Sequence, residues 1–177
     1  MSRSRTILTN PNPLLRKRAK EVSAAAFKTA ALKHAIRDLI ATLKVSEDGI
    51  GIAAPQIGIA WRIFIVSEEA KHLSQSRAKE NREWKQLVYI NPVITKFSTK
   101  KAEGVEGCLS VPGKYGFVTR PEKVQVEAFD EKGKKFSHGA SKFFARVIQH
   151  ETDHLDGILF IDKVTRYIEP KKSDSKL

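Results

Sequence analysis

The segment from 142 to 155 constrains the fold more than any other part of this 177-residue sequence. Its apolar residues recur at the spacing of an amphipathic α-helix, and Gly157 follows as a typical helix end. A helical projection places Glu151 in the middle of the apolar face, with His154 on that face and His150 at its edge. Burial of an unpaired carboxylate is costly, so a helix selected only for stability would not carry one there. The pattern predicts a helix whose buried face has a chemical role.

The same helix contains the sequence His-Glu-Thr-Asp-His at positions 150–154. Two histidines four positions apart face the same side of a helix and can bind one metal ion. The alternative is a pair of histidines at the core boundary whose ring nitrogens bond to backbone groups. The glutamate between them on the buried face favours the metal site. A catalytic metal usually has three protein ligands beside an open position for water, so a third ligand is required.

Cys108, the single cysteine of the chain, is the soft candidate for that ligand. It cannot form an intramolecular disulfide, which leaves a buried thiol, a reactive thiol or a metal ligand. It lies between a glycine and a short apolar run, where a loop could direct a thiolate toward a metal. No spacing rule connects it to a helix so much later in the chain. From these residues alone, the buried thiol stays open as an alternative.

The remaining pattern predicts an α+β fold. Residues 24–44 have the apolar spacing of an N-terminal amphipathic helix, and 61–66 and 87–94 are strands by their β-branched and aromatic content. Residues 124–136 alternate and contain a turn, which predicts a hairpin. The glycine-rich segment 48–58 is expected to be irregular backbone that another group approaches closely. Strands in the middle of the chain and helices at both ends are typical of this class.

The length suits one domain, so we expect residues 1–177 to form a single catalytic domain that ends in a flexible basic tail at about 164–177. No apolar run approaches the roughly 20 residues that span a bilayer, and no signal peptide is evident. We therefore expect a cytoplasmic protein without membrane contact, or an organellar one after removal of a transit segment. The formal net charge of +12 favours anionic partners such as ribosomal RNA. The scattered basic residues argue against sequence-specific nucleic-acid binding, and a solvated surface would explain them equally.

Three segments resemble motifs of the peptide deformylase family, in that family's order and spacing. They are Gly-Ile-Gly-Ile-Ala-Ala-Pro-Gln at 49–56, Glu-Gly-Cys-Leu-Ser at 106–110, and Gln-His-Glu-Thr-Asp-His-Leu-Asp-Gly at 149–157. Residues 7–16 and 89–92 are similar to the family too, so the resemblance covers most of 7–163. It implies antiparallel strands wrapped around the motif helix. It also implies a metal-dependent hydrolase that removes the formyl group from formyl-methionyl peptides of newly made proteins and releases formate.

The resemblance assigns the metal to three ligands: Cys108, His150 and His154. Glu151 would transfer the proton, while Gln56 and the backbone N–H of Leu109 would bind the developing oxyanion. We expect the substrate backbone to pair with the glycine-rich segment at two residues: Ile50 and Gly51. Phe143 and Val147 are plausible walls for a methionine side chain, although a core role fits them as well. A Cys/His/His set accepts several metals. The family implies iron(II), with zinc, nickel or cobalt in a purified sample.

Two other functions are compatible with the motif residues. A zincin-like endopeptidase also uses His-Glu-x-x-His, but with a third ligand of another kind. A basic ribosome- or RNA-binding domain with a structural metal site is the non-enzymatic alternative. The metal ligands could be oriented by hydrogen bonds from a further layer of residues, namely Asp153, Arg120 and Arg146. We expect these three residues to form ordinary surface ion pairs instead. The sequence also departs from many relatives at Lys142, where a small residue is common, and it lacks the long C-terminal helix of some bacterial members.

Overall fold

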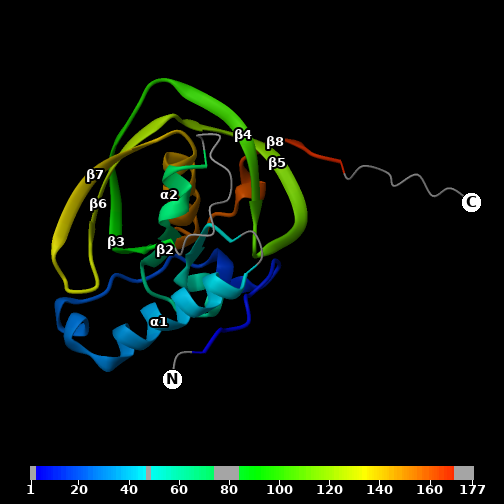
Figure 1. Ribbon diagram of the computed structural model, residues 1–177. Coiled ribbons are helices and arrows are strands. Elements are labelled where there is room, and N and C mark those ends of the chain that lie inside the picture. The colour runs from blue at the N-terminus through cyan, green and yellow to red at the C-terminus, as the bar shows by residue number, and fades with distance from the viewer. Residues whose placement is uncertain (1–2, 47–48, 74–83, 170–177) are drawn as a thin grey trace, which may run out of the picture.

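A helix near the end of the chain lies inside a curved wall of β-strands (Figure 1). The structure is a computed structural model that describes residues 3–46, 49–73 and 84–169. Within these residues the strands form two antiparallel sheets, and the helix α2 (Lys142–Leu155) lies between them. The predicted α+β fold, with antiparallel strands wrapped around the motif helix, is confirmed.

The larger sheet has five strands in the order β1-β2-β3-β6-β7. These are β1 (Gly51–Ala53), β2 (Ile63–Ser67), β3 (Gln86–Phe97), β6 (Lys123–Phe129) and β7 (Lys135–Ser141). The smaller sheet has the order β4-β5-β8. Its strands are β4 (Lys101–Cys108), β5 (Val111–Pro121) and β8 (Val164–Tyr167). Among the described strands, β1 pairs only with β2, so one edge of β1 is without a strand partner.

The N-terminal helix α1 (Ala30–Val45) starts later than the sequence predicts. Residues 24–28 form a separate 3-10 helix, and α1 begins after Thr29. The Thr29 hydroxyl accepts a hydrogen bond of 3.3 Å from the N–H of Leu32, and this cap fixes the start of α1. α1 packs on β1 and β2 through a buried apolar cluster that includes Leu39, Leu43, Ile52 and Ile65. Further 3-10 helices span Pro13–Arg16, Ala54–Ile57, Glu68–Lys71 and Phe160–Asp162.

β4 and β5 are long strands that the sequence pattern does not reveal. Glycines in β4 interrupt the alternation of apolar and polar residues, because they lie where side chains from elsewhere pack. A Cβ atom on Gly107 would lie 2.5 Å from the ring of Tyr115, and one on Gly104 would lie 2.9 Å from the guanidinium of Arg146. Close packing thus requires the residues that weaken the strand signal. Cys108 is consequently the last residue of a strand, where a loop had been expected.

The predicted hairpin of β6 and β7 is confirmed, with Lys123 paired to Ser141 and Phe129 to Lys135.

The end of the chain differs from the expected flexible tail. Residues 164–167 then form β8, which pairs with β5 through Gly116 opposite Tyr167. The tail prediction was wrong for these residues, because a free edge of β5 offers their backbone hydrogen-bond partners. The expected tail at 170–177 lies outside the described residues.

α2 fits the predicted boundaries, and its apolar side chains face the five-stranded sheet. The fully buried residues Ile148 and Leu155 pack with Phe64 and Val126 in one cluster. Burial of each such side chain contributes about 1.5–3 kcal/mol. Gly157 ends the helix region with a positive φ of 75°, and a Cβ there would lie 2.5 Å from the carbonyl oxygen of Arg16. Only glycine fits this position, which explains the helix-end signal in the sequence.

Candidate metal centre

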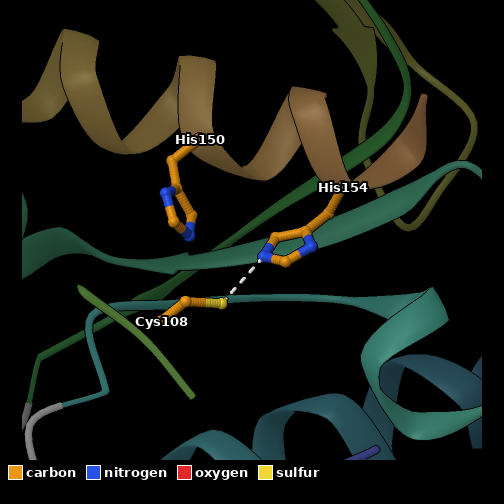
Figure 2. A group of neighbouring side chains, drawn as sticks. All are labelled: Cys108, His150 and His154. Atoms are coloured by element: carbon orange, nitrogen blue, oxygen red, sulfur yellow. Dashed lines mark hydrogen bonds between the residues drawn. The ribbon is translucent and has the colours of Figure 1, made fainter. Parts of the chain in front are cut away.

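The end of β4 meets the last turns of α2, and this contact brings three potential ligands together (Figure 2). Cys108 comes from β4, while His150 and His154 lie on one side of α2. Their ligand atoms all lie within 4.8 Å of one another. Sγ of Cys108 is 3.2 Å from Nε2 of His154. The three residues named from the sequence therefore converge in space.

This cluster fits a divalent metal ion by its chemistry. One sulfur and two imidazoles form a donor set that several divalent transition metals accept. In a tetrahedral site such ligand atoms lie about 3.5 Å apart, so the observed spacing needs only small side-chain rotations. Burial lowers the pKa of His154 well below its ordinary value, and the ring is therefore neutral, as a metal ligand must be. His150 is bonded through Nδ1, which leaves its Nε2 to face the cysteine.

His150 is held by Glu106, a residue whose role the sequence did not reveal. The distance from Nδ1 of His150 to Oε2 of Glu106 is 3.0 Å. Two further bonds, of 2.6 and 2.9 Å, connect Glu106 to Arg120, and both side chains are only 4% exposed. Burial alone would raise the pKa of Glu106, but hydrogen bonds from Arg120 and His150 hold it well below its ordinary value. An ionised Glu106 can only accept, so Nδ1 of His150 donates to it and Nε2 is left to face Cys108. Burial would lower the pKa of His150, but its bonds to Cys108 and Glu106 raise that pKa to about 10, so a metal bound at Nε2 would displace a proton from that atom.

Arg146 and Asp153 extend the hydrogen-bond network of Glu106 and Arg120. Nη1 of Arg146 donates to Glu106 at 2.7 Å and to the carbonyl of Val118 at 2.8 Å. Asp153 accepts from Arg120 at 2.8 Å. The expectation of ordinary surface ion pairs was wrong, because Arg120 is 4% exposed, Arg146 12% and Asp153 15%. These residues join α2 to the three-stranded sheet directly behind His150.

Glu151 lies on the buried face of α2, as the helical projection predicts, and is 4% exposed. Burial raises the pKa of its carboxyl group to about 7. Its Oε2 atom is buried and has no hydrogen-bond partner among the described residues. Its Oε1 atom lies so close to Gly51 of β1 that a Cβ there would collide with it. A carboxyl group with a pKa near neutrality can both take up and release a proton at physiological pH.

Gln56 is fully buried beside the cluster with its side-chain amide in a fixed orientation. Its Oε1 accepts a 2.7 Å bond from the N–H of Ala53, so its NH₂ group points the opposite way. That group donates to the hydroxyl of Ser110 at 3.1 Å and lies 3.7 Å from Sγ of Cys108. The backbone of Ala53 therefore fixes which end of Gln56 faces the candidate metal centre.

A pocket of about 440 Å³ opens onto this cluster. The glycine-rich segment 49–51 lines one side, β4 and β5 line another, and α2 contributes the floor. The structure places nearly all sequence-predicted site residues at this pocket. They are Ile50, Gly51, Gln56, Cys108, Leu109, Phe143, Val147, His150 and Glu151. His154 lies behind them and is 1% exposed.

Comparison with known proteins decides the family. The family model for polypeptide deformylases matches residues 4–169. The chain belongs to the polypeptide deformylase family. Among its relatives, peptide deformylase 1 of Vibrio vulnificus is 42% identical over 166 residues, which cover 94% of this chain and 87% of that protein. The chloroplastic/mitochondrial peptide deformylase 1A of Arabidopsis thaliana is 37% identical over 163 residues. That match covers 89% of this chain but only 60% of the plant protein.

Solved deformylase structures share the fold. The class I type b peptide deformylase of Acinetobacter baumannii, bound to Met-Ala-Ser, has a TM-score of 0.81 and 34% identity, with 93% of this chain and all of that chain covered. The peptide deformylase of Thermotoga maritima has a TM-score of 0.78 and 32% identity, covering 92% of this chain and 99% of that chain. The family expected from the sequence motifs is therefore confirmed, in preference to a zincin-like endopeptidase. In the described part of the chain, no helix has the length and apolar character that crossing a membrane requires.

Proposed function

We propose that this chain hydrolyses the formyl group from N-formyl-methionyl peptides of newly made proteins, as a metal-dependent enzyme. The observation that supports this most is the convergence of Cys108, His150 and His154 beside a buried, unpartnered Glu151 oxygen. A structural metal site would not require a carboxyl group with a raised pKa at the floor of an open pocket.

Cys108, His150 and His154 would hold the divalent metal, which would supply a bound water of lowered pKa and a positive charge for the formyl oxygen. Glu151 accepts the proton of the attacking water, for which its pKa of about 7 is suited. The same carboxyl group then delivers that proton to the departing amine. The N–H groups of Gln56 and Leu109 donate to the formyl oxygen as negative charge develops on it. The products are formate and a peptide with a free amino terminus.

The proposed substrate contacts follow from the free edge of β1. A strand edge without a partner presents N–H and C=O groups that can pair with an extended peptide, and Gly51 begins this strand beside the pocket. Ile50 precedes it and also lines the pocket, while its carbonyl oxygen bonds to β2. A side chain at Gly51 would displace Glu151, so a glycine here keeps the peptide backbone and the acid close together. Phe143 and Val147 then provide the apolar walls for the methionine side chain.

We propose iron(II) as the native metal, with zinc, nickel or cobalt as substitutes. One thiolate and two imidazoles form a donor set that admits all four ions, and the family resemblance selects iron. The Cys108→Ser variant should bind the metal at least tenfold more weakly, because an alcohol is a poorer ligand for these ions than a thiolate. Chelator competition measures this directly, and unchanged affinity would exclude the cysteine from the site.

We further propose that residues 1–177 act as one catalytic domain in the cytoplasm. Relatives occur in bacteria and in plant organelles. The net charge of +12 would support contact with the ribosome, where formylated chains emerge. Co-sedimentation with ribosomes should then weaken as the salt concentration rises. The lysines at 171, 172 and 176, which are candidates for that contact, lie outside the described residues.

The deciding experiment measures formate release from formyl-Met-Ala together with metal analysis of the same sample. We expect turnover that depends on bound metal and that disappears with a strong chelator. Acetyl-Met-Ala and an internal peptide bond serve as control substrates, because a general amidase or an endopeptidase would cleave one of them. A metal-loaded sample that leaves formyl-Met-Ala intact would refute the proposal.

A further inference from the structure

The strand β7 is the outer strand of the five-stranded sheet, at the opposite end from β1 (Figure 1). Its pairing with β6 is regular, from Lys123 opposite Ser141 to Phe129 opposite Lys135. It contains neither a proline nor a β-bulge, which are two of the features that protect an edge strand from further pairing. Lys135 at its start is neutralised by Glu127 of β6 at 2.7 Å. The rest of β7 therefore offers a regular edge to another extended chain.

Alternate residues of β7 direct their backbone groups away from β6. Just past the strand, the N–H of Lys142 bonds to the carbonyl of Glu122. Bonding in an antiparallel ladder alternates, so the even-numbered residues of β7 bond to β6 and residues 135, 137 and 139 face outward. Within the described ranges, no backbone group bonds to the N–H groups of these three residues. The carbonyl of Gly139 lies 3.0 Å from Nδ1 of His138 and keeps its second lone pair.

A second pocket, of about 790 Å³, borders this edge. It shares no lining residue with the pocket at the candidate metal centre. Its floor is a row of nearly parallel rings, in which His138 lies 5.9 Å from Phe136 and 5.8 Å from Phe144. The hydroxyl of the buried Tyr89 lies 2.9 Å from Nε2 of His138 and holds that ring in place. Side chains on this face of an added strand would therefore pack against rigid rings.

The rim of this second pocket has an excess of positive charge. Four lysines line the pocket: Lys71, Lys85, Lys132 and Lys142. Only Lys71 forms an ion pair within the described ranges, at 3.1 Å from Glu68. The lining acids are Asp130 and Glu131, and the first of them accepts N–H bonds within its own turn. The N-terminal turn of α2 contains no acidic residue and adds partial positive charge.

We propose that the edge of β7 binds an acidic, extended segment of another protein, which adds as an antiparallel sixth strand with its carboxylates beside the lysines of the rim. The free backbone groups select a peptide rather than a nucleic acid, because only a peptide can continue the ladder. A second copy of this chain is disfavoured by charge. Antiparallel pairing of two β7 edges would bring Lys132 of each copy toward Lys142 of the other.

This binding site is independent of the proposed function, because it uses no residue of the candidate metal centre. The test measures binding of a fluorescently labelled heptapeptide, acetyl-Asp-Glu-Val-Thr-Val-Glu-Asp-amide, to the metal-loaded protein by anisotropy. The peptide has the length of β7 and can place its valines over the rings and its aspartates near the lysines. We expect saturable binding about tenfold tighter than that of an analogue with lysine at every acidic position, and weaker binding as salt rises.

N-methylated versions of the peptide test the backbone pairing without any change to the protein. In the antiparallel arrangement the N–H of the threonine faces β7, whereas those of the valines face solvent. Methylation of the threonine nitrogen should therefore weaken binding about tenfold or more, because it removes a hydrogen bond and blocks close approach. Methylation of the valine nitrogens should change the affinity less than about threefold.

Two variants test the edge and the rim from the side of the protein. Ser137→Pro blocks an added strand but removes no bond to β6, so binding should weaken about tenfold. Ser137→Ala is the matched control, since it loses the same 2.9 Å bond from Gln125 but keeps the N–H. The double variant Lys132→Ser/Lys142→Gly should weaken binding roughly three- to tenfold. Glycine fits position 142, where φ is 55°, so the fold should be retained.

The rate with formyl-Met-Ala should be the same in Ser137→Pro and the wild type. If thermal unfolding shows that this variant is destabilised, the two N-methylated peptides decide. Absence of binding, equal binding of the acidic and lysine peptides, or equal binding of both N-methylated peptides would overturn the proposal. So would a dimer in sedimentation velocity that Ser137→Pro abolishes, because the edge would then belong to a second copy. Binding of single-stranded RNA that the double variant loses and Ser137→Pro keeps would assign the lysines to nucleic acid and overturn it as well.

Discussion

The two sheets hold α2 by different physical means. On the side of the five-stranded sheet, Ile148 and Leu155 are fully buried among apolar side chains. On the side of the three-stranded sheet, Arg146 and Glu106 provide directional hydrogen bonds and buried ion pairs. Apolar packing stabilises a helix but tolerates small rotations, whereas charge-assisted bonds fix the direction of a particular atom. The comparison suggests that one side supplies stability and the other orients the metal ligands.

The largest expected effect comes from a variant that changes the catalytic carboxyl group but neither the apolar packing nor the ion pairs around α2. The Glu151→Gln variant keeps the size of the side chain but removes the group that transfers the proton. We expect formate release to fall about 10²- to 10⁴-fold, the usual contribution of general acid–base catalysis. Metal content should remain that of the wild type, and the unfolding temperature should stay equal or rise, since a buried carboxyl group is removed. A variant that retains wild-type turnover would exclude the proton-transfer role.

The next largest effect comes from a variant that changes only the apolar packing of α2 on the five-stranded sheet. Ile148→Ala removes a fully buried side chain from the cluster beneath α2. The free energy of unfolding should fall by about 2–5 kcal/mol, because the truncation leaves a cavity. Metal affinity, measured well below the unfolding temperature, should change less than twofold. A large loss of metal affinity in this variant would show that the two sides of α2 are not separable.

The opposite side should respond mainly in metal affinity. Glu106→Gln weakens the acceptor that orients His150 and leaves Arg120 and Arg146 with an uncharged partner. We expect metal affinity to fall about 10- to 100-fold, the usual effect of removing the group behind a ligating histidine. Competition with a chromogenic chelator measures this. If the affinity stays unchanged while the unfolding temperature falls, the network is a structural support only.

The smallest effect concerns a charged contact away from α2, which shows what an ordinary ion pair contributes. Nε of Arg5 donates to the carboxylate of Asp38 in α1 at 2.6 Å. Burial by itself would raise the pKa of Asp38, but the bonds from Arg5 and the N–H of Arg3 keep it below its ordinary value of 3.8. When the pKa of a carboxyl group is lower in the folded state, the resulting stability is fully present above the unfolded-state pKa. It is lost as the pH falls from the unfolded-state pKa through the folded-state pKa.

The difference in unfolding temperature between wild type and Asp38→Asn should accordingly be constant above about pH 5 and shrink as the pH falls below the ordinary carboxyl range. Metal affinity should be equal in the two proteins at neutral pH. A difference that grows on acidification would contradict the assigned direction of the shift. This variant is the reference for Glu106→Gln, since both remove a carboxylate that an arginine holds.

Local sequence determined those parts of the protein that depend on contacts within one element. The period of 3.6 residues identified α2 and placed Glu151 on its buried face, and alternation identified the β6-β7 hairpin. The spacing of His150 and His154 predicted that they lie on one side of the helix. Phe143 and Val147 followed from the same helix, while the family motifs supplied Gln56, Leu109 and the choice of Cys108 as a ligand.

Tertiary structure decided what depends on residues far apart in the chain. The strands β4 and β5 were missed because their glycines make room for Tyr115 and Arg146, a need that no local pattern expresses. The same sheet brings Cys108 to the histidines and places Glu106 behind His150. A charged residue in a sequence does not show whether it is solvated or buried against an opposite charge. That distinction arises only when strands from separate segments pack on α2, because burial and pairing are properties of the assembled fold.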